Sequence, residues 1–204
     1  MAPEPRSADP HDAPINLGTR AMEDLQYIRE TIASASRYTT FSGKGLMVVG
    51  VGAIIAGTLA SRIAAGAPQA HIWLADAVIS VLVGVLFGLH KARASEQSVL
   101  SGPIRKFTLS FAPVIFAAAL LTLALLRANE TALLPGTWLC LYGAAITAAG
   151  TSSVPLVPFM GIAFLGLGTL ALLGPTGLGN GLMIAGFGGL QLLFGGLIAR
   201  RYGG

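Results

Sequence analysis

The chain has little of what soluble folds and metal sites depend on. Of its 204 residues only 11% are charged, whereas a soluble globular domain averages about 25%. The single cysteine, Cys140, excludes an internal disulfide and a cysteine-based metal cluster. The three histidines, His11, His71 and His90, are too far apart in the expected topology for two of them to share an ion. We therefore expect no metal and no cofactor.

A catalytic group with an activating neighbour is lacking as well. Thr151-Ser152-Ser153 offers hydroxyl groups, but the sequence shows no base that would activate them. The net charge of +4 comes from basic residues that flank apolar stretches instead of forming a basic patch, and no nucleic-acid motif is present. We expect no catalytic residues and no binding to nucleic acid.

Six apolar stretches make up most of the chain, and four of the five connections between them contain proline or glycine. About 20 apolar residues in a helix cross the ~30 Å hydrocarbon core of a bilayer. The sequence therefore predicts an all-α, polytopic membrane protein with six transmembrane helices. The predicted spans are about 45–61, 72–89, 107–126, 133–149, 156–173 and 181–198.

Lysine and arginine are sorted across the connections between these spans. If alternate connections face the same side, 11 of the 13 basic residues fall on one side and only Arg62 and Arg127 on the other. Cytoplasmic loops carry such an excess of positive charge. Trp73 and Trp138 both lie near the outer ends of spans, where aromatic belts form. The pattern predicts that both termini are cytoplasmic.

Two segments precede the bundle of residues 42–204. Residues 1–16 are rich in proline and predict a flexible tail, whereas residues 17–41 place Leu25, Ile28 and Ile32 on one stripe of an amphipathic helix. The arginines of this helix are balanced by acidic residues, which fits contact with protein better than with anionic lipid. The stripe is either a docking face for a partner or a surface that packs across the cytoplasmic end of its own bundle.

Glycine accounts for 27 residues, most of them inside the apolar stretches. Gly84 and Gly88 are four residues apart in the second span, and Gly177, Gly181, Ala185 and Gly189 continue the same spacing into the sixth. Small residues on one helix face let backbones approach closely. These strips predict either packing within the bundle or association with a second copy or another membrane subunit.

Asp76 is the only acidic residue within a predicted span. At about four residues into the span, roughly 6 Å at 1.5 Å per residue, it is expected near the outer interface. Ser80 lies one turn deeper on the same face, and Arg62 and Arg127 are the candidate pairing partners. The carboxylate is either a structural, paired or water-exposed group, or a site that handles protons or cations.

Leu25-Gln26-Tyr27-Ile28-Arg29-Glu30-Thr31-Ile32 is followed by Phe41-Ser42-Gly43-Lys44-Gly45. In this LxYIRExI motif, and over roughly residues 22–57, the chain resembles a family of small bacterial integral membrane proteins. No activity is known for that family. The resemblance therefore implies the bacterial inner membrane and supplies no site residue.

The sequence favours a non-enzymatic inner-membrane protein that acts as a subunit, scaffold or adaptor of a membrane complex. Its expected surroundings are the lipid bilayer and a protein partner or second copy, contacted through the glycine-rich faces and the 17–41 helix. The alternative is a small transporter or channel that moves protons, cations or a small solute by means of Asp76. Against transport, no span shows a broken helix with polar groups clustered at the midplane.

Overall fold

The computed structural model describes residues 22, 24–27, 42–94, 102–151, 153–175 and 177–202. The chain divides into two units, Met1–Arg37 and Tyr38–Gly204. In the first unit Met22 and residues 24–27 are helical, and the side chain of Leu25 is exposed. The predicted tail 1–16, most of the predicted helix 17–41, and the docking candidates Ile28 and Ile32 lie outside the described residues.

The second unit is built from six helices that are long and apolar enough to cross a membrane, which confirms the predicted fold class. Among the described residues there is no strand. The elements are α2 (Gly43–Ala60), α3 (Ala67–Ala94), α4 (Gly102–Arg127), the short 3₁₀ helix η1 (Thr131–Leu133), α5 (Leu134–Gly150), α6 (Leu156–Leu173), α7 (Gly179–Met183), the π-helix η2 (Ile184–Leu190) and α8 (Gln191–Tyr202). The last three form one continuous span.

Helix α3 is longer than the predicted span 72–89 because it begins at Ala67. Pro68 lies in its first turn, where the missing N–H costs no helical hydrogen bond. Because Gln69 and His71 are polar, this first turn does not form part of an apolar stretch and lies outside the predicted span. Because of this early start, every residue of α3 lies farther from the first residue of its helix than predicted.

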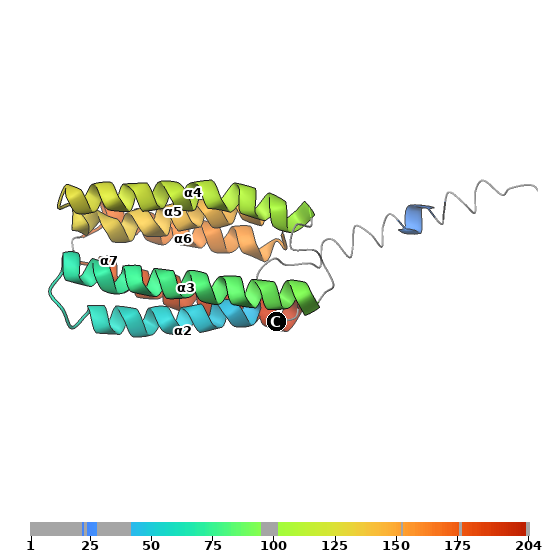
Figure 1. Cartoon of the computed structure of the whole chain (residues 1–204), viewed down its shortest axis with the longest axis horizontal. Helices are drawn as coiled ribbons and strands as arrows, with labels where there is room; N and C mark the ends of the chain where they lie inside the picture. Colours follow the sequence, from blue (N-terminus) through green and yellow to red (C-terminus); the bar gives the residue numbers. More distant parts are fainter. Residues whose placement is uncertain are drawn as a thin grey trace, which may run out of the picture. The chain divides into compact units, whose positions relative to one another are not determined.

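The helices form two layers (Figure 1). Helices α2 and α3 lie together in one layer, and α4, α5 and α6 lie in the other. The last span packs along α2 and also contacts α6, so it joins the layers. The main helical neighbour of α3 is α2, and that of α4 is α5, which leaves α3 and α4 as outer helices.

Two series of glycines, each with a seven-residue spacing, mark the closest helix approaches. Residues seven apart lie on the same side of a helix, two turns from each other. In α2 the series faces the last span, and in α5 it faces α6: Gly43, Gly50 and Gly57, then Gly136, Gly143 and Gly150. A methyl group on Gly143 would lie 2.7 Å from the carbonyl oxygen of Gly161, so no larger residue fits without moving backbone.

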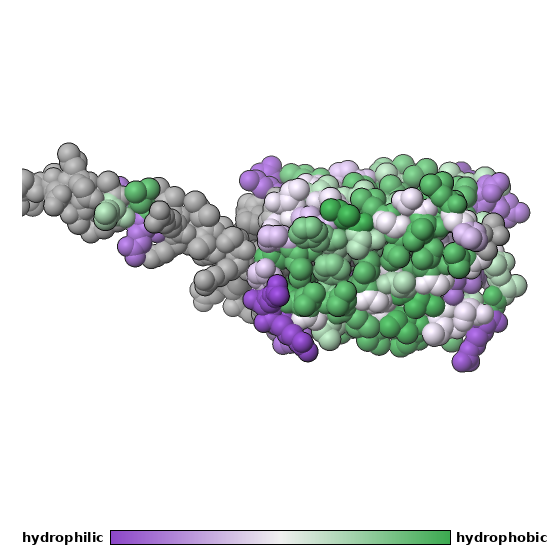
Figure 2. All heavy atoms as spheres, turned by 180° about the vertical axis from the view of Figure 1, so that it is seen from behind, coloured by the Kyte–Doolittle hydropathy of each residue, from purple (hydrophilic) through white to green (hydrophobic). Residues whose placement is uncertain are grey.

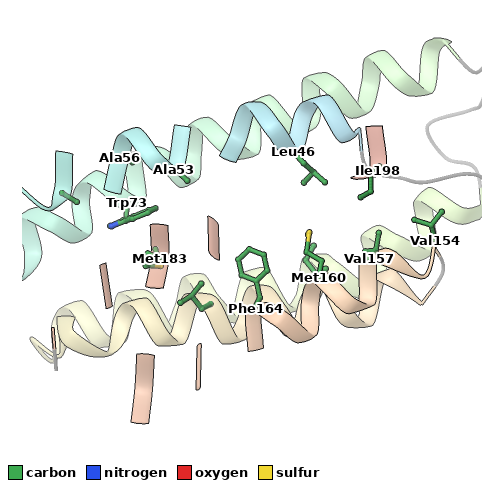
Figure 3. Close-up of a cluster of buried hydrophobic side chains, with 13 residues drawn as sticks. Leu46, Ala53, Ala56, Trp73, Val154, Val157, Met160, Phe164, Met183 and Ile198 are labelled. Carbon is green, nitrogen blue, oxygen red and sulfur yellow. The ribbon is translucent and has the colours of Figure 1, made fainter. Parts of the chain in front are cut away.

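Side chains from both layers meet between them (Figure 3). Trp73 of α3 and Phe164 of α6 point into this core, and both are buried. Phe187 of η2 lies between them, with its ring centroid 6.5 Å from that of Trp73 and 5.2 Å from that of Phe164. Tyr142 of α5 completes the aromatic cluster, 5.1 Å from Phe187.

The visible flank of the bundle is a broad hydrophobic band, with hydrophilic residues gathered at its two ends (Figure 2). Large aliphatic side chains such as Val78 and Leu86 of α3 and Leu120 of α4 are more than half exposed. A soluble monomer rarely exposes a contiguous apolar patch of more than a few hundred Å². The surface therefore suits lipid as its surroundings.

We expect Gly143→Ala to lower the free energy of unfolding by about 1–3 kcal/mol, because the added methyl group meets rigid backbone. Gly84→Ala in α3 is the matched control, since no heavy atom lies within 4 Å of the position of its added methyl group. That control should change the same quantity by less than about 0.5 kcal/mol. Reversible unfolding in mixed micelles measures both variants, and equal effects would contradict the assignment of Gly143 to a close contact.

Candidate functional site

Asp76 lies opposite the middle of α2. A methyl group on Gly52, which is midway along this 18-residue helix, would lie 3.2 Å from the Oδ1 atom of Asp76. Because α3 begins at Ala67, Asp76 is also roughly 14 Å along its own helix at 1.5 Å per residue. Asp76 therefore lies farther along its helix than the ~6 Å counted from the start of the predicted span, because that count left out the first turns of α3.

The groups expected to surround Asp76 do not pair with it. Within the described residues, the side chains of Asp76 and Ser80 make no hydrogen bond or ion pair. Arg62 lies in the turn after α2 and Arg127 in the last turn of α4; both side chains are exposed, and neither guanidinium forms an ion pair with Asp76 in the described part of the chain. The structure thus leaves a partly exposed carboxylate beside α2 without a partner among the described residues.

A cavity of about 370 Å³ opens where α2 ends and α3 begins. We call this end of the bundle the Trp end, because Trp73 and Trp138 both line the cavity. Its walls also include Pro135 at the start of α5 and Leu172 at the end of α6. The starts of α3 and α5 and the end of α6 therefore meet at this cavity.

A chain of hydrogen bonds ties the cavity wall to the C-terminal part of α2. The indole Nε1 of Trp73 donates to the Oδ1 of Asn180 over 2.9 Å, and the Nδ2 of Asn180 donates to the carbonyl oxygen of Gly57 over 3.0 Å. The amide of Gln69 donates to the carbonyl oxygen of Ala60 over 3.1 Å. The carbonyl oxygens of Gly57 and Ala60 also accept from the backbone N–H groups of Ser61 and Ile63. The side chains therefore add a second hydrogen bond to each carbonyl and fix Asn180 in the wall.

A polar pair, Gln191 and Tyr142, lies halfway along the last span. Gln191, only 2% exposed, donates from Nε2 to the hydroxyl oxygen of Tyr142 over 3.3 Å. Its Oε1 atom is buried and has no hydrogen-bond partner. Gln191 directly follows the π-helix η2, a rare form that often marks functional sites. The hydrogen bond joins the last span to α5, and the carbonyl of Gln191 is the polar atom that it leaves unsatisfied.

The glycine strips with a four-residue spacing do not pack within the bundle. Among the described residues, no heavy atom lies within 4 Å of the position of an added methyl group at Gly84, Gly88, Gly181 or Gly189. Ala185, between the last two, is exposed. These strips therefore present open backbone on α3 and on the last span.

No three His, Cys, Asp or Glu side chains in the described part of the chain come together as a metal-binding group. Comparisons with known proteins give no match, whether against family models, curated proteins or solved structures. Three features of the bundle therefore bear on function: Asp76, the cavity at the Trp end and the pair Tyr142–Gln191.

We expect Tyr142→Phe to lower the free energy of unfolding by about 0.6–1.7 kcal/mol, because the buried amide of Gln191 then loses its acceptor. Gln191→Met removes the unsatisfied carbonyl at similar volume, so stability should stay the same or rise. In the Gln191→Met background, Tyr142→Phe should cost little. A full cost in both backgrounds, measured by unfolding in mixed micelles, would show that this hydrogen bond contributes nothing.

Proposed function

We propose that the protein is a non-enzymatic integral membrane protein that acts as a subunit or scaffold of a membrane complex. Asp76 carries this proposal. A charged side chain at the centre of a spanning helix costs roughly 2.5–3.5 kcal/mol on insertion, and no group in the described part of the bundle offsets that cost for Asp76. A hydrogen-bond donor or a cation from a neighbouring subunit would do so.

The outer helices support the same proposal. Only 11% of the residues in the apolar window of α3 and 6% of those in α4 are buried, against 44% in α2. Gly84 and Gly88 on α3, and Gly181 and Gly189 on the last span, offer open strips on which a partner helix or a second copy can approach closely. Asp76 and the first strip belong to the same helix.

The amphipathic segment 17–41 is the proposed contact on the cytoplasmic side. Leu25 of its apolar stripe is 56% exposed. Together with Ile28 and Ile32, which lie outside the described residues, it would form a docking face for an adaptor role. The balanced charge on the rest of the segment favours a protein over a lipid partner.

A small transporter or channel is the second candidate, and one observation favours it. The last span contains a π-helix beside the buried polar pair Tyr142–Gln191. Irregular helices near the midplane are typical of transporters, and the sequence alone shows no sign of one. Asp76 would then carry a proton or bind a cation or small solute at a similar depth, on the other side of α2.

We further propose a bacterial inner membrane, with both termini in the cytoplasm. The described basic residues support this orientation. Lys44, Arg105, Lys106, Arg200 and Arg201 belong to the end where α2 and α4 begin and α8 ends, and Arg62 and Arg127 to the Trp end. An excess of positive charge marks the cytoplasmic side.

Purification from native membranes in mild detergent, followed by mass determination of the intact assembly, tests the subunit role. We expect a stoichiometric partner or a second copy that is lost in Asp76→Leu, because leucine offers no group for the partner to bind. Ala77→Leu, at the exposed neighbouring position, is the control and should retain the partner.

A lone chain from both wild type and variants would contradict the subunit proposal and direct attention to transport. In that case Asp76→Asn should abolish proton or cation flux in liposomes, while the protein remains folded. Flux that is unchanged by Asp76→Asn would remove this carboxylate from any transport mechanism.

Cysteine labelling tests the orientation. In a Cys140→Ala background, Ser98→Cys between α3 and α4 should react with a membrane-impermeant reagent only after the cells are opened. Ala64→Cys, in the exposed turn at the Trp end, should react in intact cells. The reverse pattern would overturn the proposed orientation.

A further inference from the structure

We propose that the cavity at the Trp end is a binding site for a small uncharged molecule that carries a hydroxyl or amide group and a short apolar part. This site is separate from Asp76 and does not depend on the subunit role. Its residues come from α3, η1, α5, α6 and α7, so only the folded bundle assembles it.

The volume of the cavity sets the size of the ligand. At about 370 Å³ it falls within the range of small-molecule pockets. A water molecule takes about 30 Å³ of liquid volume, so the cavity holds roughly a dozen non-hydrogen atoms. Leu133, Pro135 and Leu172 give it apolar walls, against which a short hydrocarbon part would pack.

The hydrogen-bonding capacity of the wall sets the ligand's polar group. Gln69 uses one N–H for Ala60, and Asn180 uses one N–H for Gly57, so each amide retains a second N–H donor. The carbonyl oxygen of Gln69 and the hydroxyl of Thr131 have no partner within the described residues. The cavity therefore offers both donors and acceptors, which a hydroxyl or amide group can satisfy at once.

The absence of charge in the wall excludes ionic ligands. No Asp, Glu, Lys, Arg or His is among the described residues that line the cavity. An ion moved from water into such a site loses hydration without gaining a charged partner. A neutral group loses much less, because the amides replace its hydrogen bonds to water.

The tryptophans make the site directly measurable. The chain has only two, Trp73 and Trp138, and both line the cavity. The tryptophan fluorescence of the full chain therefore reports on this site, and a saturable change distinguishes binding from partition of the probe into the bilayer. The experiment titrates 1-hexanol, hexanamide, hexanoate and hexylammonium at neutral pH into the protein in phosphatidylcholine nanodiscs.

We expect 1-hexanol and hexanamide to change the fluorescence saturably, and the two ions to bind at least about tenfold more weakly. Gln69→Leu should weaken binding of the neutral probes roughly fivefold, because it removes one hydrogen-bonding amide. Ala132→Phe, at an exposed position in the wall, should abolish saturation by filling the cavity. Thr169→Val on α6 is away from the cavity and should change nothing.

Two results would overturn the proposal. A response linear in probe concentration and equal in Ala132→Phe would mean simple partition into the bilayer. Equal saturation by the ions would remove the selectivity for uncharged groups. If Ala132→Phe loses its helical circular dichroism, Gln69→Leu and the ionic probes still decide the question.

One further arm identifies the source of the ligand. Dioleoylglycerol, a membrane lipid with a free hydroxyl group, is added to the nanodiscs before the titration. Displacement of 1-hexanol would identify a membrane lipid as the source of the recognised group, and unchanged binding would identify a solute from water. Both outcomes keep the proposed chemistry of the site.

Discussion

Close backbone contact at glycine is the constraint on which the rest of this bundle depends. Lipid chains are as apolar as leucine, so helices in a bilayer gain little from burying apolar side chains against one another and rely on dense packing. The two glycine series with a seven-residue spacing bring α2 against the last span and α5 against α6. Because these pairs are tight, aromatic rings fill the space between the layers, and α3 and α4 remain at the edges with one main neighbour each.

The polar groups of the bundle fall into two kinds. At the Trp end, Gln69, Trp73 and Asn180 satisfy one another and the carbonyls of α2. Near the middle of their helices, Asp76 and the carbonyl of Gln191 have no partner in the part of the chain that the structure describes. An unsatisfied polar group costs most where water is absent. The first kind stabilises the fold, whereas the second kind lowers its stability, and for that reason it supports the proposal that another molecule contacts Asp76.

The number of helices followed from the sequence because length and composition alone define a span. The position of Asp76 along its helix did not, because Pro68, Gln69 and His71 look like a connection, whereas the helix begins at Ala67. The series Gly136, Gly143 and Gly150 is present in the sequence, but the packing prediction rested on spacings of four residues. Among the described residues, no heavy atom lies within 4 Å of a methyl group added at Gly84 or Gly181. The pair Tyr142–Gln191 joins residues far apart in the chain, and no local pattern predicts it.

The π-helix η2 sets the rotational phase between the two ends of the last span. Each of its turns closes from residue i to i+5 and so holds one residue more than an α-helical turn. With this extra residue, Asn180 reaches Trp73 at one end while Gln191 stays buried against Tyr142 at mid-span. Regular α-helix over the same seven residues, Ile184–Leu190, would no longer take up the extra residue and would rotate one end against the other by about 100°. Either Asn180 or Gln191 would then turn away from its partner, so both hydrogen bonds depend on the π-helical winding of this short segment.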